Sequence, residues 1–272
     1  MKIAFENEII IVDKNNNVQN FIEGKIASTQ VINKIKQIRP DLISREWITH
    51  ELDASQIELK NMWPKNSLSE AQDEILELFE VTKNILQNEF WLYISQSVVP
   101  KKDFKPVSSS SIKRYDEVHE NLLKVWKAYR KATNIAGLHI NFDTDFGLYL
   151  AINNIVWELL NAWNLKKLWA SKNRFELYKK VVAWVNQIYN TNLQVTPTLY
   201  KNIDEMTQKL LDKDKNPHFS YEFLRLKKIK ENYVWELRSF DWWVNSKDLE
   251  TKTKNAFDFI KNIKNSILNL TK

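Results

Sequence analysis

Glycine is so rare in this chain that whole classes of nucleotide-binding fold are excluded. The 272 residues contain only three glycines, Gly24, Gly137 and Gly147. Phosphate-binding loops, dinucleotide fingerprints and kinase glycine-rich loops each need several closely spaced glycines. If the protein handles a nucleotide, it must hold the phosphates through metal ions and basic side chains.

The order of the expected helices and strands indicates an α+β fold. Apolar and β-branched runs predict short strands, and helical spacing of apolar residues predicts long helices between them. We expect strands at 2–13, 90–99, 136–143 and 233–241, an extended segment at 44–60, and helices at 25–38, 66–89, 112–133, 146–170, 174–190, 198–212 and 248–270. Without regular βαβ alternation, this order favours an antiparallel or mixed sheet packed by long helices. No linker is visible, so we expect a single domain over residues 1–272.

Two helix boundaries carry specific signals. Ser67 and Glu70 form a capping-box pattern ahead of an amphipathic helix. Pro40 predicts that the helix at 25–38 ends before it, because proline disfavours helical geometry at the preceding residue.

Cysteine content, hydropathy and charge bear on the compartment and on the partners. The chain has no cysteine, which excludes disulfides and thiolate chemistry and fits a reducing, cytoplasmic interior. The longest apolar stretch, 148–163, contains Glu158 and three asparagines, so we expect a buried helix and no membrane association. The net charge of +6 favours anionic partners. The basic residues are scattered, however, which gives nucleic-acid binding only weak support.

Three expected strands carry two polar or charged residues two positions apart. The pairs are Glu6 with Glu8, His139 with Asn141, and Glu236 with Arg238. Alternate side chains of a strand point to the same face, so each pair shares one face of its strand and leaves the other face apolar. Taken alone, Glu236 and Arg238 fit an edge strand with a solvated ion pair.

If these strands are neighbours, one face of the sheet gathers several carboxylates and a histidine. Glu51 and Glu58 in the extended segment add two more carboxylates. Such a group repels and raises the pKa values of its members, unless divalent cations fill it. Mg²⁺ prefers oxygen ligands and shares them with substrate phosphates, and an imidazole in the set suits Mn²⁺. The sequence leaves the adjacency of the strands open.

Four motifs follow one another along the chain: "FENEIIIVDKNNNVQ", "HELDASQIELKN", "AGLHINFD" and "YVWELRSFD". In this order they resemble the motifs of the glutamate–cysteine ligase family of carboxylate–amine ligases, which shares the catalytic architecture of glutamine synthetase. The resemblance spans residues 4–242 and implies a glutamine synthetase-like fold with a metal-binding sheet face.

The resemblance also implies an ATP-dependent enzyme that forms an amide or peptide-type bond. In such ligases ATP phosphorylates a carboxylate, here on glutamate or a similar amino acid or peptide, and an amine then displaces the phosphate. Two or three Mg²⁺ or Mn²⁺ ions screen the charges of the phosphates and the carboxylate. The partners implied are ATP, a carboxylate substrate and an amine substrate.

Roles for particular residues follow from the same resemblance. Arg238 would contact the phosphoryl group or the substrate carboxylate, where a fixed bidentate donor suits an anion better than lysine does. Glu236 and Arg238 are the candidate catalytic residues, and Arg174 is a second candidate for ATP binding. The candidate metal ligands are Glu6, Glu8, Glu51, Glu58, His139 and Glu236. Because Glu51 and Glu58 are an odd number of residues apart, we expect a bulge or bend between them.

Two other functions stay open at this point. A catalytically silent relative would use the fold for binding or assembly, and replacing Glu58 or Glu236 by alanine would then stabilise it. A basic nucleic-acid-binding protein would bind with a steep dependence on salt. The short region after Asp241 and the 11 tryptophans favour self-association, so a homo-oligomer is expected.

Overall fold

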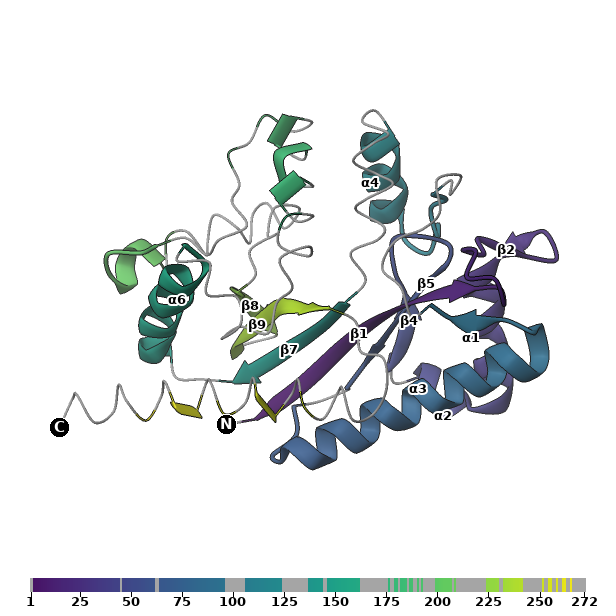
Figure 1. The fold of residues 1–272 in the computed structure, drawn as a ribbon, viewed down its shortest axis with the longest axis horizontal. Coiled ribbons are helices and arrows are strands. Elements are labelled where there is room, and N and C mark those ends of the chain that lie inside the picture. The colour runs from purple at the N-terminus through teal and green to yellow at the C-terminus, as the bar shows by residue number, and fades with distance from the viewer. Residues whose placement is uncertain are drawn as a thin grey trace.

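The fold is described from a computed structural model of the chain (Figure 1). The structure describes residues 2–44, 46–61, 64–95, 106–123, 137–143, 146–161, 224–229 and 232–241. It also describes isolated positions and short stretches between 176 and 208 and between 251 and 265.

An antiparallel sheet forms the centre of the described structure. Across it, the strands follow the order β4 (Ile48–His50), β5 (Gln56–Lys60), β1 (Ile3–Val12), β7 (Gly137–Asp143), β9 (Asn232–Asp241) and β8 (Leu224–Ile229). A further strand, β6 (Tyr93–Ile94), pairs with the end of β1. All pairings among these strands are antiparallel, which confirms the expected α+β fold with an antiparallel sheet.

Helices lie on both sides of this sheet (Figure 1). On one side lie α1 (Ala27–Ile38), α2 (Pro40–Ser44) and α3 (Leu68–Phe90), and on the other α4 (Lys113–Leu123). The helix α6 (Phe146–Asn161) follows β7 in the chain. A small hairpin of β2 (Phe21–Ile22) and β3 (Lys25–Ile26) precedes α1.

The alternation of side chains along β1 separates the core from the polar face. Ile3, Phe5 and Ile9 are fully buried in the main core, together with residues of α1 and α3 such as Val31 and Ile75. Glu6 and Glu8 occupy the alternate positions and therefore point to the opposite face of the strand. A register slip of one residue would bury these acids in the apolar core, so the pattern fixes the register.

Both predicted helix boundaries are confirmed. The Ser67 hydroxyl accepts a hydrogen bond of 3.2 Å from the Glu70 backbone N–H at the start of α3. The helix α1 ends at Ile38, and Pro40 is the first residue of α2, a position that needs no backbone N–H.

The structure excludes one alternative and corrects one expectation. Glu236 and Arg238 do not form a solvated pair on an edge strand, because β9 lies between β7 and β8 and Glu236 is fully buried. The strand expected at 90–99 is described only as β6, and β8 was not predicted although Leu224 and Leu226 alternate with basic residues.

Other expectations fall partly or largely outside the described residues. These are the second half of the helix expected at 112–133, the end of the helix at 146–170, parts of the helices at 174–190 and 198–212, and most of the helix at 248–270.

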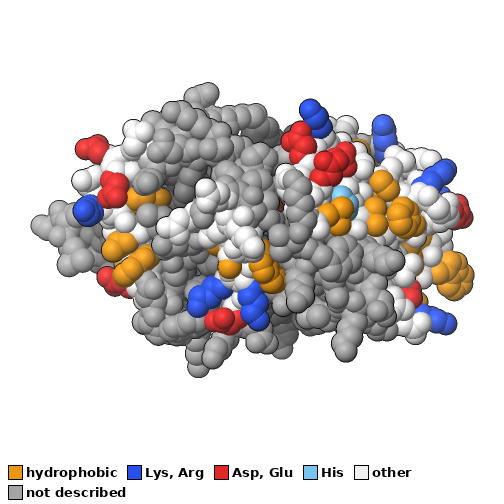
Figure 2. All heavy atoms as spheres, turned by 90° about the horizontal axis from the view of Figure 1, so that it is seen from above, with side chains coloured by type: hydrophobic (Ala, Val, Ile, Leu, Met, Phe, Trp, Pro, Cys, Tyr) orange, Lys and Arg blue, Asp and Glu red, His pale blue; other side chains and the backbone are white. Residues whose placement is uncertain are grey.

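The surface seen from above carries charges of both signs (Figure 2). Small groups of acidic and basic side chains alternate with apolar ones over the described part of this face, without one broad basic area. Within the part of the chain that the structure describes, no helix combines the length and apolar character that crossing a membrane requires.

Candidate functional site

The register of four neighbouring strands gathers the predicted polar residues on one face of the sheet. Glu6 of β1 lies opposite His139 of β7, and Glu8 lies opposite Glu58 of β5. The next pairing places Asn141 of β7 opposite Glu236 of β9. We call this surface the charged face, defined by Glu6, Glu8, Glu58, Lys60, His139, Asn141 and Glu236.

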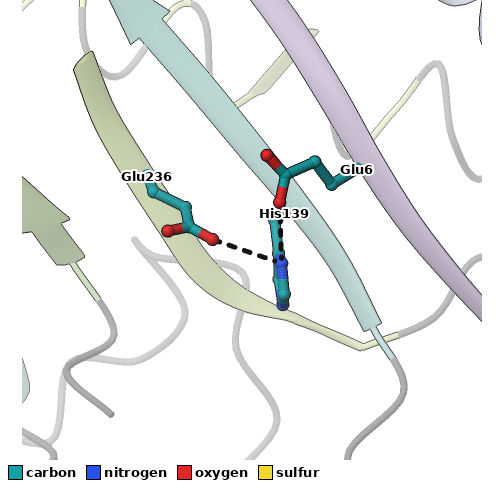
Figure 3. Close-up of side chains that lie close together, drawn as sticks. All are labelled: Glu6, His139 and Glu236. Carbon is teal, nitrogen blue, oxygen red and sulfur yellow. Dashed lines mark ion pairs between the residues drawn. The ribbon is translucent and has the colours of Figure 1, made fainter. Parts of the chain in front are cut away.

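Glu6, His139 and Glu236 form the tightest cluster on the charged face (Figure 3). One possible ligand atom from each lies within 4.8 Å of the others. Nδ1 of His139 is 3.4 Å from Oε1 of Glu236 and 3.7 Å from Oε2 of Glu6. Its Nε2 is 3.8 Å from Oε1 of Glu8. The carboxylates of β1 and β9, the two strands that flank β7, therefore point toward the imidazole of His139.

His139 is held in its neutral form. Burial lowers its pKa to about 4, and the positive charge of Arg238 adds to this effect, while Glu6 and Glu236 oppose it. Neither ring nitrogen makes a hydrogen bond to a described residue. A neutral imidazole has a lone pair for a metal ion, so at neutral pH His139 is in the form that a ligand needs.

Hydrogen bonds orient two of the carboxylates. The Asn141 side-chain amide donates a hydrogen bond of 3.2 Å to Glu6, and the Gly137 backbone N–H donates one of 3.2 Å to Glu8. Partners of this kind fix the direction of a carboxylate ligand and tune its affinity for a cation.

Glu51 and Glu58 are joined by a reversal of the chain between the antiparallel strands β4 and β5, which takes the place of the expected bulge or bend within one strand. β4 ends at His50 and β5 begins at Gln56, so residues 51–55 leave the strand geometry between Glu51 and Glu58. The buried Asp53 fixes this reversal, because its carboxylate accepts hydrogen bonds from the backbone N–H groups of Ser55 (2.9 Å) and Val107 (3.1 Å).

The pKa of Glu51 reflects its surroundings. Burial raises the pKa to about 7, and the negative charges of Glu58 and Glu6 raise it further, whereas Arg238 lowers it. Arg238 thus acts electrostatically on both Glu51 and His139. Arg174, the second basic candidate, lies outside the described residues.

Two residues of this neighbourhood were missed by the sequence interpretation. Lys60 donates a hydrogen bond of 3.2 Å to Oε1 of Glu58, and Asn61 binds the backbone of β1 at Phe5. The spacing of Glu58 and Lys60 is the same as that of Glu236 and Arg238, and this signal could have identified Lys60. No local pattern points to Asn61.

The dimensions of the tight cluster suit a divalent cation. Ligands on opposite sides of an octahedral Mg²⁺ are about 4.2 Å apart, since each lies about 2.1 Å from the ion. Nδ1 of His139 lies 3.4 Å from Glu236 and 3.7 Å from Glu6, which is within this value. Two carboxylates and a neutral imidazole could therefore bind a metal ion here.

The fold and the site define a class of proteins in which an antiparallel sheet, packed by helices, presents carboxylates and a histidine on one face. The model of glutamate–cysteine ligase family 2 (GCS2) matches residues 3–159, more than half of the chain, so the chain belongs to this family of ATP-dependent carboxylate–amine ligases. The matched range includes Glu6, Glu8, Glu51, Glu58 and His139 and ends before Glu236.

A solved structure supports the same fold. The crystal structure of a bifunctional glutathione synthetase from Pasteurella multocida superposes with a TM-score of 0.54 at 15% sequence identity. The match covers 95% of this chain and 38% of that chain, so this protein spans well under half the length of that structure. A search of curated protein sequences finds no match.

Proposed function

We propose that the protein is an ATP-dependent ligase that joins a carboxylate to an amine through an acyl-phosphate intermediate. The observation that carries the proposal is the cluster of Glu6, His139 and Glu236 on three adjacent strands of a GCS2 family member. Glutamate, or a similar amino acid or peptide carboxylate, is the proposed acceptor of the phosphoryl group.

The proposed metal ligands divide into a core set and an outer set. Glu6, His139 and Glu236 would hold Mg²⁺ or Mn²⁺, and Glu8, Glu51 and Glu58 would supply further oxygens. When bound, such ions neutralise phosphate oxygens and stabilise the charge that develops in phosphoryl transfer.

Arg238 has a separate proposed role. Its guanidinium carries a permanent charge beside the carboxylates, and it would orient the phosphoryl group or the substrate carboxylate by paired hydrogen bonds. Glu236 and Arg238 are two residues apart on β9, so one strand would hold the metal and the anion side by side.

The proposed reaction has two steps. A carboxylate oxygen of the substrate attacks the γ-phosphorus of ATP, and ADP leaves. The amine nitrogen then attacks the acyl carbon, phosphate leaves, and the nitrogen loses one proton to give the amide.

We also propose that residues 1–272 act as one catalytic domain, since a single chain of known structure matches 95% of this chain. Self-association into a homo-oligomer is part of the same proposal.

Calorimetric titration of ATP tests the proposal without knowledge of the substrates. We expect ATP to bind the wild type in the presence of Mg²⁺ and at least tenfold more weakly in its absence. Glu236→Gln keeps the size of the side chain and removes its charge. We therefore expect this variant to lose the magnesium-dependent part of its ATP affinity.

The matched control is Glu80→Gln, which removes an exposed carboxylate paired with Lys83 on α3. This variant should bind Mg²⁺ and ATP as the wild type does. Absence of ATP binding in all three proteins would overturn the proposed ligase function.

A further inference from the structure

Lys60 is a basic residue within the acidic part of the charged face. Its Cα lies opposite that of Glu6 in the pairing of β1 with β5. Its Nζ lies 3.2 Å from Oε1 of Glu58. The side chains of Lys60 and Glu58 are 30% and 16% exposed, so most of this ion pair is withdrawn from water.

Among the described residues, Thr49 and Lys60 both donate to Glu58. The Thr49 hydroxyl, across the pairing of β4 with β5, donates to the same Oε1 at 3.4 Å. Among the described residues, Glu58 does not belong to the cluster that can share one ion, which consists of Glu6, His139 and Glu236. A candidate metal ligand is thus bound to an ammonium group.

An ammonium group and a divalent ion that contact the same carboxylate oxygen repel each other. A metal–oxygen bond is about 2.1 Å long, so an ion bound to Oε1 of Glu58 would lie within a few ångströms of Nζ of Lys60. Repulsion between like charges is stronger at a partly buried position than in water, because the effective dielectric constant is lower. The long side chain of Lys60 can move away from Glu58, but only at the loss of this ion pair.

We propose that Lys60 is a built-in counter-cation for Glu58 and competes with a second divalent ion for this carboxylate. The inference rests on the proposed function, because the second ion would belong to the ligase site. Its consequence is an order of loading. A first ion binds Glu6, His139 and Glu236, and a second ion reaches Glu58 once the phosphates of a nucleotide draw Lys60 away.

Titration with Mn²⁺ in the absence of nucleotide tests the competition. Electron paramagnetic resonance of free Mn²⁺ gives the number of bound ions and their affinities. We expect one tight and one weak Mn²⁺ in the wild type. In Lys60→Met the second Mn²⁺ should bind at least tenfold more tightly than in the wild type, with the first unchanged.

Three further variants make the result specific. Lys60→Arg keeps the positive charge and should behave as the wild type does. Lys83→Met removes a lysine from an exposed ion pair on α3 and should also leave both affinities unchanged. Lys60→Gln repeats the measurement if Lys60→Met does not fold.

The Glu236→Gln variant separates a failure of this inference from a failure of the proposed function. If Mn²⁺ binds the wild type in a manner that depends on Glu236, and Lys60→Met leaves the second affinity unchanged, the competition is overturned and the metal site stands. If no variant binds Mn²⁺, both proposals are overturned.

Discussion

Burial moves the pKa values of His139 and Glu51 in opposite directions. Burial disfavours the charged form of each group, so His139 releases its proton, with a pKa of about 4, and Glu51 retains its proton, with a pKa of about 7. At neutral pH the metal-free site therefore contains a neutral imidazole and a carboxyl group near half protonation. The site carries less negative charge than its number of acids suggests.

Glu51→Gln should stabilise the metal-free protein at alkaline pH. The pKa of Glu51 in the folded protein lies above its ordinary value of 4.5, so its contribution to stability is fully present below pH 4.5 and is lost as pH rises through 7. We expect the variant to exceed the wild type by about 3 kcal/mol at pH 8 in EDTA, and the difference to become small by pH 4.5.

Urea denaturation at several pH values measures this difference. His139 has the opposite dependence, because a lowered pKa costs stability as pH falls from 6.5 toward 4. The wild type and Glu51→Gln share this pH dependence of His139, so it cancels when their stabilities are compared. A variant less stable than the wild type at pH 8 would contradict the role assigned to burial.

The sequence predicted the acids and the histidine of the site because their spacing of two follows directly from strand geometry. Glu6, Glu8, His139 and Glu236 are all accessible to this reasoning. The partners that orient them are not. The contact of Gly137 with Glu8 joins residues far apart in the chain and becomes visible only once β1 and β7 are paired.

At the level of strands and helices, Asn61 connects the end of β5 to β1 and α3. Its side-chain oxygen accepts a hydrogen bond of 2.7 Å from the Phe5 backbone N–H, and its own N–H donates one of 3.0 Å to the Phe5 carbonyl. Its side-chain amide donates to the Ala71 carbonyl and to Glu74 of α3. Asn61 thus fixes β1 one residue before Glu6.

Asn61→Ala should reduce both stability and metal affinity. Removal of the side chain leaves the buried Phe5 N–H without its acceptor, which costs about 2–3 kcal/mol. We expect the loosened β1 to weaken Mn²⁺ binding by at least threefold. Urea denaturation and Mn²⁺ titration measure the two effects.

Ser67→Ala is the matched control for this prediction. It removes the N-cap of α3 and should cost about 1 kcal/mol, with Mn²⁺ affinity unchanged. Equal effects of the two variants on Mn²⁺ binding would show that Asn61 acts only through overall stability.

The odd spacing of Glu51 and Glu58 showed that they cannot share one face of a regular strand, but it did not predict the chain reversal between β4 and β5. The order of the strands was not predictable either. Nothing local indicates that β9 lies between β7 and β8, so the stretch around Glu236 taken alone could not exclude an edge strand. The strand β8 was missed because its segment, "LRLKKI", is as typical of a basic surface group as of a strand.

For the whole molecule, the fold class and the composition of the charged face could be predicted, and the arrangement of surface charge could not. The net charge of +6 left nucleic-acid binding open. Figure 2 shows acidic and basic groups interspersed over the described part of one face, where a nucleic-acid site needs a basic stripe or patch.

Divalent cations should stabilise the whole molecule if the site binds them. A ligand at 100 times its dissociation constant adds about 2.7 kcal/mol to the folded state, which corresponds to a rise in Tm of about 5–10 °C for a chain of this length. We expect this rise on adding MnCl₂ to the wild type and its loss in Glu236→Gln.

A silent relative gives the opposite pattern in the same thermal melts. Its acids would only repel one another, so Glu236→Ala would raise Tm in EDTA, and Mn²⁺ would leave the wild type unchanged. That combination would contradict the proposed metal site.

The position of β1 in the sheet has a consequence for biosynthesis. β1 pairs with β5, β6 and β7, and its partner β7 follows more than a hundred residues later in the chain. At ~5–20 residues per second, the ribosome takes on the order of ten seconds to supply β7 after β1. During this interval one edge of a long apolar strand has no native partner, and it is open to pairing with other nascent chains. We therefore expect the yield of folded protein to depend on chaperones that bind exposed strands.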